Sequence, residues 1–411
     1  MILFVAYGGG HVAMLAPVAQ ALQGAGRPFV FLALTTARAH LERLGLASIG
    51  FRDLPGATDA AVRAYGERLA ADLAPGGIVA HEETVAYLGL NYRDLVEQHG
   101  PERAEQLYRE NGRHAFLPVI TLGAAIEACG ATLVVATNSP RAERAAIMAA
   151  GERGIASLCL VDLFAAQEIK WIGVPGYATR VALLNEDVRR TFIDYGRQPD
   201  ELVVTGNPAF DRLREPEVIE AGRALRRANG WDDGSTTILW ASQIESQVHP
   251  FSGQVGDPAL PRQIEACLRQ FVAGNHRFRL VIRYHPSERE QFVKQDRVFF
   301  SPSAESLSPL LHAVDLVVVT ASTVGLEAWL AGRTVISVDN SIFQADAPYS
   351  QMGISTGAAS VADLVATIEQ VQARQAGAAA TAGPDRAGSA TAQVVALIGQ
   401  LLPHGAAPAS A

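Results

Sequence analysis

Short apolar runs alternate with helical stretches along most of the chain. The first run covers residues 2–6, a turn follows at Gly8-Gly9-Gly10, and a second apolar run covers residues 29–33. Between these two runs, the apolar residues of 12–23 recur at the spacing typical of a helix. Because continuous apolar runs are typical of strands buried on both faces of a parallel sheet, the first forty residues predict a strand–helix–strand unit.

The alternation resumes after a charged, largely helical stretch at about residues 59–112, which we expect to cover the sheet and to shape an acceptor-binding side. Four more apolar runs, at 132–136, 157–161, 181–185 and 201–205, predict further strands. Gly206-Asn207-Pro208 then ends the pattern, because proline lacks an N–H donor and restricts the residue before it. A domain boundary is expected soon after this turn.

The second half of the chain restarts the same pattern. Its predicted strands cover 237–241, 279–284, 316–320 and 334–339, and its predicted helices include 261–273 and 324–331. The predicted fold class is therefore α/β, with two Rossmann-like domains, 1–212 and 213–375, whose parallel sheets face a central cleft. An alanine- and glycine-rich segment at 376–390 predicts a flexible linker, and a final helix is predicted at 391–402.

Composition agrees with two globular domains. The chain has 411 residues, 49% of them hydrophobic and 18% charged, which is too long for one ordinary core and too apolar for a disordered protein. The net charge of −8 is spread without blocks of like charge, which argues against nucleic acid as a partner. The three cysteines form no CxxC or Cys/His pattern, so neither a disulfide framework nor a zinc site is indicated.

The location of the protein in the cell is predicted from the apolar runs, none of which has the features of a secretion signal or a transmembrane helix. Residues 1–6 are neither preceded by a basic region nor long enough for a secretion signal, and no run of ~18–20 uncharged apolar residues occurs. We expect a cytoplasmic protein, with peripheral contact at the inner face of the membrane left open.

The strongest local feature is Tyr7-Gly8-Gly9-Gly10-His11, between the first strand and the first helix. Gly9 and Gly10 permit a tight turn and close approach of the backbone to a ligand, and the helix N-terminus that follows attracts anions. The dinucleotide fingerprint G-x-G-x-x-G fails because Ala13 stands where its last glycine belongs. The failed fingerprint therefore argues against a nicotinamide-dinucleotide enzyme.

His11 lies where a strand ends at the ligand-binding edge of a parallel sheet. An imidazole titrates near neutral pH and suits a general base that takes a proton from a hydroxyl. The alternative is a histidine that caps the helix or bonds the backbone. The glycine-rich context favours the catalytic interpretation.

Polar residues in the second half also follow strands. Ser322 and Thr323 begin a helix, where their hydroxyls either cap it or bind a phosphate, and Glu327, one turn later, suits the hydroxyls of a ribose. His285, before Pro286, can donate to a phosphate or to a base carbonyl. Ser242 and Gln243 follow the first strand of this half, within expected reach of phosphate oxygens.

Asn138, Arg141 and Asp162 follow strands in the first half and are weaker candidates for the acceptor side. The sequence has no P-loop, no G-x-S-x-G, no HExxH and no EF-hand, so it gives no support for serine hydrolysis, P-loop phosphoryl transfer or a metal site. We expect neither a metal nor a cofactor.

Several of these motifs resemble those of the GT-B superfamily of nucleotide-sugar enzymes. The Gly8–His11 loop resembles that of lipid I N-acetylglucosaminyltransferases and of UDP-sugar hydrolases that make pseudaminic acid precursors. Gly206-Asn207-Pro208 with Asp211, and the segment 321–328, are similar to lipid-A-disaccharide synthases and non-hydrolysing UDP-N-acetylglucosamine 2-epimerases. His285-Pro286 with Ser322-Thr323 is similar to motifs of sialyltransferases, Kdo transferases and CDP-glycerol polymerases, which bind cytidine nucleotides.

The resemblance implies a metal-independent inverting glycosyltransferase with a UDP-sugar donor favoured. It also implies that the final helix, 391–402, packs back on the N-terminal domain. The acceptor of this transferase would be the hydroxyl of a sugar, lipid-linked or small-molecule substrate in cell-envelope, polysaccharide or glycoconjugate biosynthesis. By the same resemblance His285, Ser322 and Thr323 hold the phosphates, Glu327 the ribose, and His11 acts on the acceptor. Three alternatives stay open: a UDP-sugar hydrolase or 2-epimerase, a CMP-sugar or CDP-glycerol-type transferase, and a non-catalytic nucleotide-sugar-binding protein. The paired glycines that precede the ribose glutamate in the epimerases are Ser322-Thr323 here, which argues against epimerisation.

Overall fold

The computed structural model describes residues 1–71, 73, 79–375 and 388–403. The chain forms two compact units, one of Met1–Ala209 with the C-terminal segment from Gly388, the other of Phe210–Ala387. Most of the linker expected at 376–390 lies outside the described residues.

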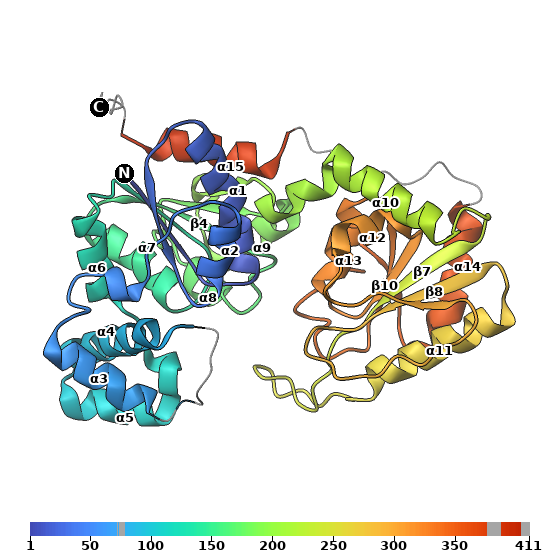
Figure 1. The fold of residues 1–411 in the computed structure, drawn as a ribbon, viewed down its shortest axis with the longest axis horizontal. Coiled ribbons are helices and arrows are strands. Elements are labelled where there is room, and N and C mark those ends of the chain that lie inside the picture. The colour runs from blue at the N-terminus through green and yellow to red at the C-terminus, as the bar shows by residue number, and fades with distance from the viewer. Residues whose placement is uncertain (72, 74–78, 376–387, 404–411) are drawn as a thin grey trace. The chain divides into compact units, whose positions relative to one another are not determined.

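The first unit is built on a six-stranded sheet of order β2-β1-β3-β4-β5-β6, in which every pair is parallel (Figure 1). β1 lies in the interior, with Ile2 opposite both Phe29 of β2 and Leu133 of β3. The strands are β1 (Ile2–Ala6), β2 (Phe29–Ala33), β3 (Leu133–Ala136), β4 (Ala156–Leu160), β5 (Arg180–Leu183) and β6 (Leu202–Val204).

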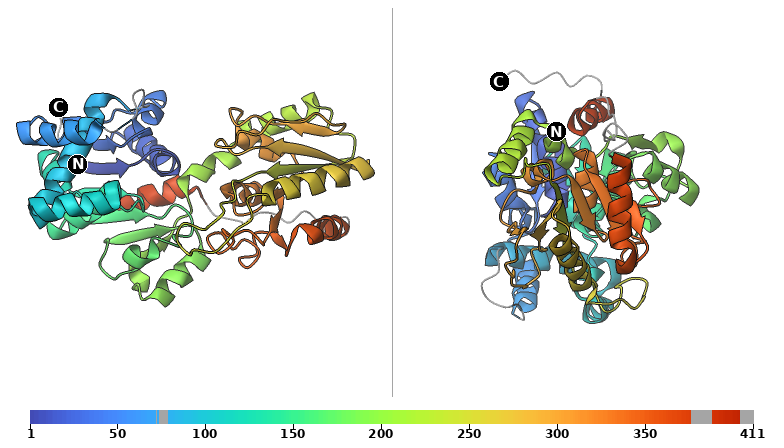
Figure 2. Two further views of the ribbon diagram at one scale, coloured as in Figure 1. Left: turned by 90° about the horizontal axis from the view of Figure 1, so that it is seen from below. Right: turned by 90° about the vertical axis from the view of Figure 1, so that its right-hand side faces the viewer.

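Helices lie on both faces of this sheet, as Figures 1 and 2 show. All five residues of β1 are buried, which is why this strand is apolar without alternation. The helices of the unit are α1 (Gly10–Gly24), α2 (Ala37–Arg43), α3 (Ala60–Ala70), α4 (His81–His99), α5 (Pro101–Asn111), α6 (Val119–Ala128), α7 (Ala142–Glu152), α8 (Ile169–Ile172), α9 (Glu186–Tyr195) and α15 (Ala390–Leu401).

The last helix, α15, belongs to the core of the first unit. Its Val394, Leu397 and Ile398 are buried in one cluster with Leu15 and Val18 of α1. The chain therefore returns to its first unit after completing the second.

The helices α3, α4 and α5 form a small core of their own between β2 and β3. Gly66 of α3 and Gly89 of α4 allow a close crossing, because a Cβ at either position would lie 2.1 Å from a carbonyl oxygen of the facing helix. The charged stretch expected to cover the sheet thus packs mainly on itself, around Tyr65, Tyr92 and Tyr108.

The second unit contains another all-parallel six-stranded sheet, of order β12-β11-β10-β7-β8-β9 (Figure 1). Its strands are β7 (Thr236–Ala241), β8 (Phe278–Arg283), β9 (Val298–Phe300), β10 (Leu316–Val319), β11 (Thr334–Val338) and β12 (Thr356–Ala358). Its helices are α10 (Pro216–Ala228), α11 (Leu260–Gly274), α12 (Leu307–Ala313), α13 (Thr323–Leu330) and α14 (Leu364–Gln375). Two parallel six-stranded sheets with helices around them confirm the two-domain Rossmann-like prediction.

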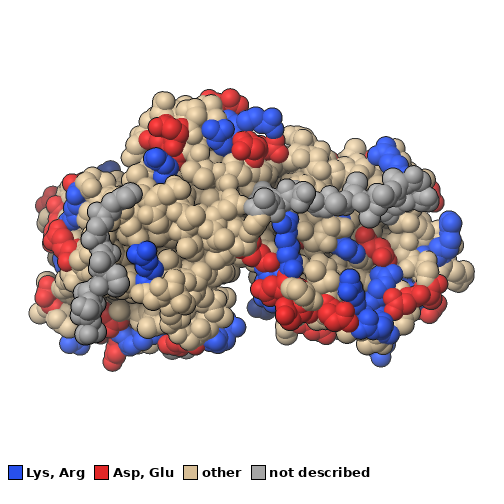
Figure 3. All heavy atoms as spheres, turned by 90° about the horizontal axis from the view of Figure 1, so that it is seen from above, with Lys and Arg blue, Asp and Glu red and all other residues tan. Residues whose placement is uncertain are grey.

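The charges on the surface and the length of the helices complete the description of the fold. Basic and acidic side chains are interspersed on the face drawn in Figure 3. Among the described residues, no helix is long and apolar enough to cross a membrane.

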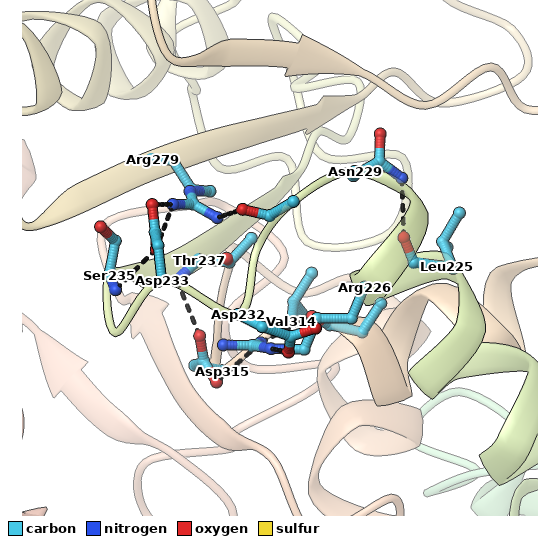
Figure 4. A network of polar contacts seen from close by, with 12 residues as sticks. Leu225, Arg226, Asn229, Asp232, Asp233, Ser235, Thr237, Arg279, Val314 and Asp315 are labelled. Carbon is cyan, nitrogen blue, oxygen red and sulfur yellow. Dashed lines mark hydrogen bonds and ion pairs between the residues drawn. The ribbon is translucent and has the colours of Figure 1, made fainter.

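A polar network fixes α10 to the amino-terminal edge of the second sheet (Figure 4). Asp315 Oδ2 accepts the N–H of Thr237 at 2.8 Å, and Asp315 Oδ1 lies 3.0 Å from Arg226 Nη1. Arg226 also donates to the carbonyl of Ala313 at 2.8 Å. Because Thr237 is fully buried, Asp315 satisfies an N–H that water does not reach.

We expect Asp315→Ala to lower the free energy of unfolding by about 1–3 kcal/mol, since it leaves the Thr237 N–H without an acceptor. Asp232→Ala is the matched control, because Asp232 contacts the same arginine but is 55% exposed and accepts no buried N–H. Urea denaturation followed by tryptophan fluorescence measures both variants. Equal stability of the two would contradict this account of the network.

Candidate functional site

The first sheet has a switch point between β1 and β3. The chain leaves β1 for β2 on one side and returns to β3 on the other, so the connections diverge from the carboxyl ends of these two strands. Such points leave a crevice where open α/β sheets bind ligands. His11 follows β1 and Thr137 follows β3, and His11 Nδ1 lies 2.6 Å from Thr137 Oγ1.

The two predicted glycines shape the start of α1. Gly9 has a φ of 70°, in the left-handed region, and no side chain caps the helix. A Cβ at Gly10 would lie 3.2 Å from Asp162 Oδ2, so any other residue here would require that carboxylate to shift by a few tenths of an ångström. The backbone N–H groups that begin α1 therefore face a polar edge with no side-chain cap of their own.

The surroundings of His11 centre on Glu143 of α7, which is fully buried. Glu143 accepts the N–H of Tyr7 at 2.7 Å and of Ser139 at 3.1 Å, and it accepts the hydroxyl of Thr137. The His11 side chain is 27% exposed, and its Nε2 makes no hydrogen bond to the described residues. Glu143 is not among the residues predicted from the sequence, because it follows no strand directly and lies inside an alanine-rich helix.

Asn138 and Asp162, both predicted, lie together at the same edge. The Asp162 N–H donates to Asn138 Oδ1 at 2.9 Å. Asn207 Nδ2 donates to the Asp162 carbonyl at 2.9 Å and lies 3.4 Å from Asp162 Oδ1. Burial raises the pKa of Asp162, although the charges of His11 and the bond from Asn207 oppose this. The Gly-Asn-Pro turn after β6 thus supports the carboxylate after β4.

Glu168, immediately before α8, is a second carboxylate that interacts electrostatically with His11 and Asp162. Burial raises its pKa as well, with His11 again opposing. The sequence offers little signal for it, because the segment between β4 and β5 is mostly irregular.

Arg141, the third predicted acceptor-side residue, stacks on an aromatic ring. Its guanidinium carbon lies 5.2 Å from the ring centroid of Tyr7. The Tyr7 hydroxyl is 3.2 Å from that of Tyr87 in α4, and burial raises the pKa of Tyr7, so the phenol stays protonated. Helix α4 thereby places Tyr87 beside Tyr7, the residue that precedes the glycine-rich turn.

The second sheet has its own switch point, between β7 and β10. Gln243 follows β7 and Thr320 follows β10, and Thr320 Oγ1 donates to Gln243 Oε1 at 3.4 Å. Gln243, Ser322 and Thr323 therefore follow the two strands that flank this crevice.

Ser242 is engaged within the protein. It is buried, its hydroxyl donates to Glu288 at 2.9 Å, and it accepts from Arg262 Nη2 at 2.8 Å. Glu288 also accepts the N–H of His285 at 2.7 Å. This network orders the loop that carries His285, which is a different role from the phosphate contact expected for Ser242.

His285 itself is exposed, and its Nδ1 accepts the N–H of Ser287 at 3.2 Å. A neutral imidazole held in this way carries its proton on Nε2. His285 can thus donate one hydrogen bond from Nε2, as a phosphate or a base carbonyl requires.

At the start of α13, Ser322 Oγ accepts the N–H of Val324 over a long 3.4 Å, and Thr323 is exposed. The carbonyl of Ser322 accepts the hydroxyl of Tyr349 at 2.8 Å. The Ser322 hydroxyl is therefore only a weak cap of α13, and the hydrogen bond from Tyr349 holds the backbone of Ser322 in place.

Glu327 is the most perturbed carboxyl of the second unit. Burial raises its pKa from 4.5 to about 7, even though Arg212 and Arg283 pull the pKa down. Arg283 does not pair with it directly, because its N–H groups donate to Ser301 Oγ and to carbonyls of the loop after β9. Raised pKa values of this kind cluster at functional sites.

Among the described residues, no group of three or more His, Cys, Asp or Glu side chains is arranged to hold a metal ion.

Comparison with known proteins identifies the fold. No protein-family model matches the chain, and no curated protein sequence is significantly similar to it. Among solved structures, a UDP-GlcNAc 2-epimerase from Neisseria meningitidis bound to UDP-GlcNAc is similar with a TM-score of 0.62 at 12% identity, over 97% of this chain and 100% of that one. The UDP-GlcNAc 2-epimerase from Methanocaldococcus jannaschii gives a TM-score of 0.59 at 11% identity, over 97% and 99% of the two chains. At these identities the likeness shows a shared fold.

The raised pKa of Glu327 predicts a pH-dependent stability. As the pH rises from 4.5 through about 7, the unfolded chain loses this proton before the folded chain does, so stability falls across that window. The shift corresponds to about 3 kcal/mol at full ionisation. We therefore expect Glu327→Gln to raise the Tm of the ligand-free protein by about 5–10 °C at pH 8.5 and to change it little at pH 4.5.

Differential scanning fluorimetry across this pH range measures the effect. Glu369→Gln is the control, because Glu369 is an exposed carboxylate of α14 in the same unit. A gain in Tm that is equal at both pH values, or equal in the control, would refute the explanation by burial.

Proposed function

We propose that the protein is a GT-B enzyme that acts on a nucleotide-sugar, and that its reaction is metal-independent, inverting glycosyl transfer from a UDP-sugar to a hydroxyl acceptor in polysaccharide or glycoconjugate biosynthesis. The observation that carries the proposal is the position of His11: its Nε2 has no partner among the described residues, and it follows the strand at the switch point of the first sheet. In the second unit, Glu327, His285 and the start of α13 offer groups suited to a ribose and phosphates.

In the proposed reaction, His11 Nε2 takes the proton of the acceptor hydroxyl as its oxygen attacks the anomeric carbon. The bond from that carbon to the diphosphate breaks, and the nucleoside diphosphate leaves with the electron pair. The Nε2–H of His285 and the N–H groups at the start of α13 suit the charge that develops on the leaving phosphate. His11 then returns the proton to solvent.

A second candidate function is UDP-sugar 2-epimerisation or hydrolysis, and one observation favours it. Asp162 and Glu168 both interact with His11 and both have raised pKa values, so two carboxyl groups near the base are suited to exchange protons. UDP-GlcNAc 2-epimerases are also the similar structures reported above. Incubation with donor alone separates the candidates, because an epimer or free sugar supports the second and unchanged donor supports transfer.

The nucleotide is tested by thermal stabilisation with UDP, CMP, CDP and GDP. A ligand at ~100 times its dissociation constant adds ~2.7 kcal/mol to stability. We expect stabilisation by UDP; stabilisation by CMP or CDP instead would support a CMP-sugar or CDP-glycerol donor. No stabilisation by any of the four would refute the nucleotide-sugar proposal.

The base is tested by His11→Ala. We expect this variant to keep the stabilisation by UDP while turnover falls by ~10²–10⁴-fold, because the base acts in the chemical step and not in nucleotide binding. His276→Ala is the control, because His276 lies in the turn before β8, away from the sheet edges that carry the site. Nucleotide binding with no turnover in the parent would indicate instead a non-catalytic nucleotide-sugar-binding protein.

A further inference from the structure

The contacts of Glu143 determine how the hydroxyl of Thr137 is oriented. Glu143 is fully buried and receives two backbone N–H groups, from Tyr7 and Ser139. An ionised carboxylate only accepts hydrogen bonds. The hydroxyl of Thr137, which is also fully buried, therefore donates its one proton to Glu143 Oε2.

This donation leaves Thr137 Oγ1 with lone pairs only on the side of His11. The oxygen lies 2.6 Å from His11 Nδ1, a distance that requires a proton between the two atoms. Because the hydroxyl proton is already given to Glu143, the proton must be on Nδ1. The opposite arrangement would place two acceptors, Thr137 Oγ1 and Glu143 Oε2, in close contact with no proton between them.

We infer that Thr137 and Glu143 are positioning residues that hold neutral His11 in its Nδ1–H tautomer, with the lone pair of Nε2 available as a base. The importance of this tautomer for turnover rests on the proposed function, whereas the tautomer itself does not. The other ionisable groups near the ring are Asp162 and Glu168. Both interact with His11 by charge, and within the described part of the chain neither forms a hydrogen bond with it.

The tautomer is measured by nitrogen NMR of the full chain labelled with ¹⁵N-histidine, at a pH where the imidazole is neutral, with His11→Gln used to assign the signal. The parent is expected to show Nδ1–H and an unprotonated Nε2. Thr137→Ser keeps the hydroxyl and should show the same pattern. Thr137→Val removes it and should shift His11 toward Nε2–H, the tautomer that free histidine prefers.

Glu143 is tested by Glu143→Gln, whose amide both donates and accepts. The hydroxyl of Thr137 then loses its single imposed direction, and His11 should become a mixture of tautomers. Glu152→Gln is the matched control at the exposed end of the same helix and should leave the parent pattern unchanged. If Thr137→Val does not fold, Thr137→Ala removes the same hydroxyl with a smaller side chain.

Turnover gives the second measurement. Thr137→Val should lower kcat by ~10–100-fold with little change in KM, and Thr137→Ser should restore most of it. An Nε2–H tautomer in the parent, or an Nδ1–H tautomer that persists in Thr137→Val, would overturn the inference. Absence of turnover with every donor would count against the proposed function and leave the NMR result intact, so the two failures are distinguishable.

Discussion

In a parallel sheet all strands end at the same edge, and each chain segment that leaves this edge must satisfy its backbone groups before the next helix begins. In the first unit, Glu143 is the residue that satisfies such backbone groups. One buried carboxylate accepts the N–H of Tyr7 after β1 and of Ser139 after β3, and so holds together the two loops that diverge at the switch point. The geometry around His11 depends on this interaction, because Thr137 and the glycine-rich turn are on the loops that it joins.

The second unit organises its edge in a different way. Arg283 is surrounded by loop carbonyls, and Ser242, Arg262 and Glu288 form a closed network under the His285 loop. Glu327 is half-buried and forms no ion pair with any described residue, and its ionisation costs stability because burial raises its pKa. A protein keeps such a cost where a site needs the group, and a ligand that bonds the carboxylate would recover part of it. The first unit thus has a buried carboxylate, Glu143, that accepts three hydrogen bonds within the protein, and the second has a half-buried carboxyl, Glu327, that forms no ion pair with the described residues.

Most of the architecture could be predicted from the sequence, because strands such as β1 and β10 are buried on both faces and read as continuous apolar runs. The strands β9 and β12 were missed. Each has only three residues, and β12, Thr-Gly-Ala, has no apolar run. Residues that follow a strand directly, such as His11 and Asp162, could be identified as candidates. Glu143 and Glu168 could not, because their importance arises from burial and from distances between loops far apart in sequence. The same limit applies to Ser242, whose hydroxyl is occupied by Glu288, 46 residues later.

The fold does not decide between transfer and epimerisation, because both reactions need a base close to a sugar, and the side chains at the site must distinguish them. Transfer needs one group that accepts a proton from the acceptor hydroxyl. Epimerisation at C2 needs groups that remove and return a proton on opposite faces of the ring, so one of them must be an acid that is protonated near neutral pH, and a carboxyl with a raised pKa is suited to this. Burial raises the pKa of Asp162 and of Glu168, which favours the protonated carboxyl, while the charge of His11 lowers both pKa values. The protonation state of His11 therefore sets which chemistry these carboxyls can support: a neutral imidazole leaves them nearer to acids, and an imidazolium turns them into counter-ions.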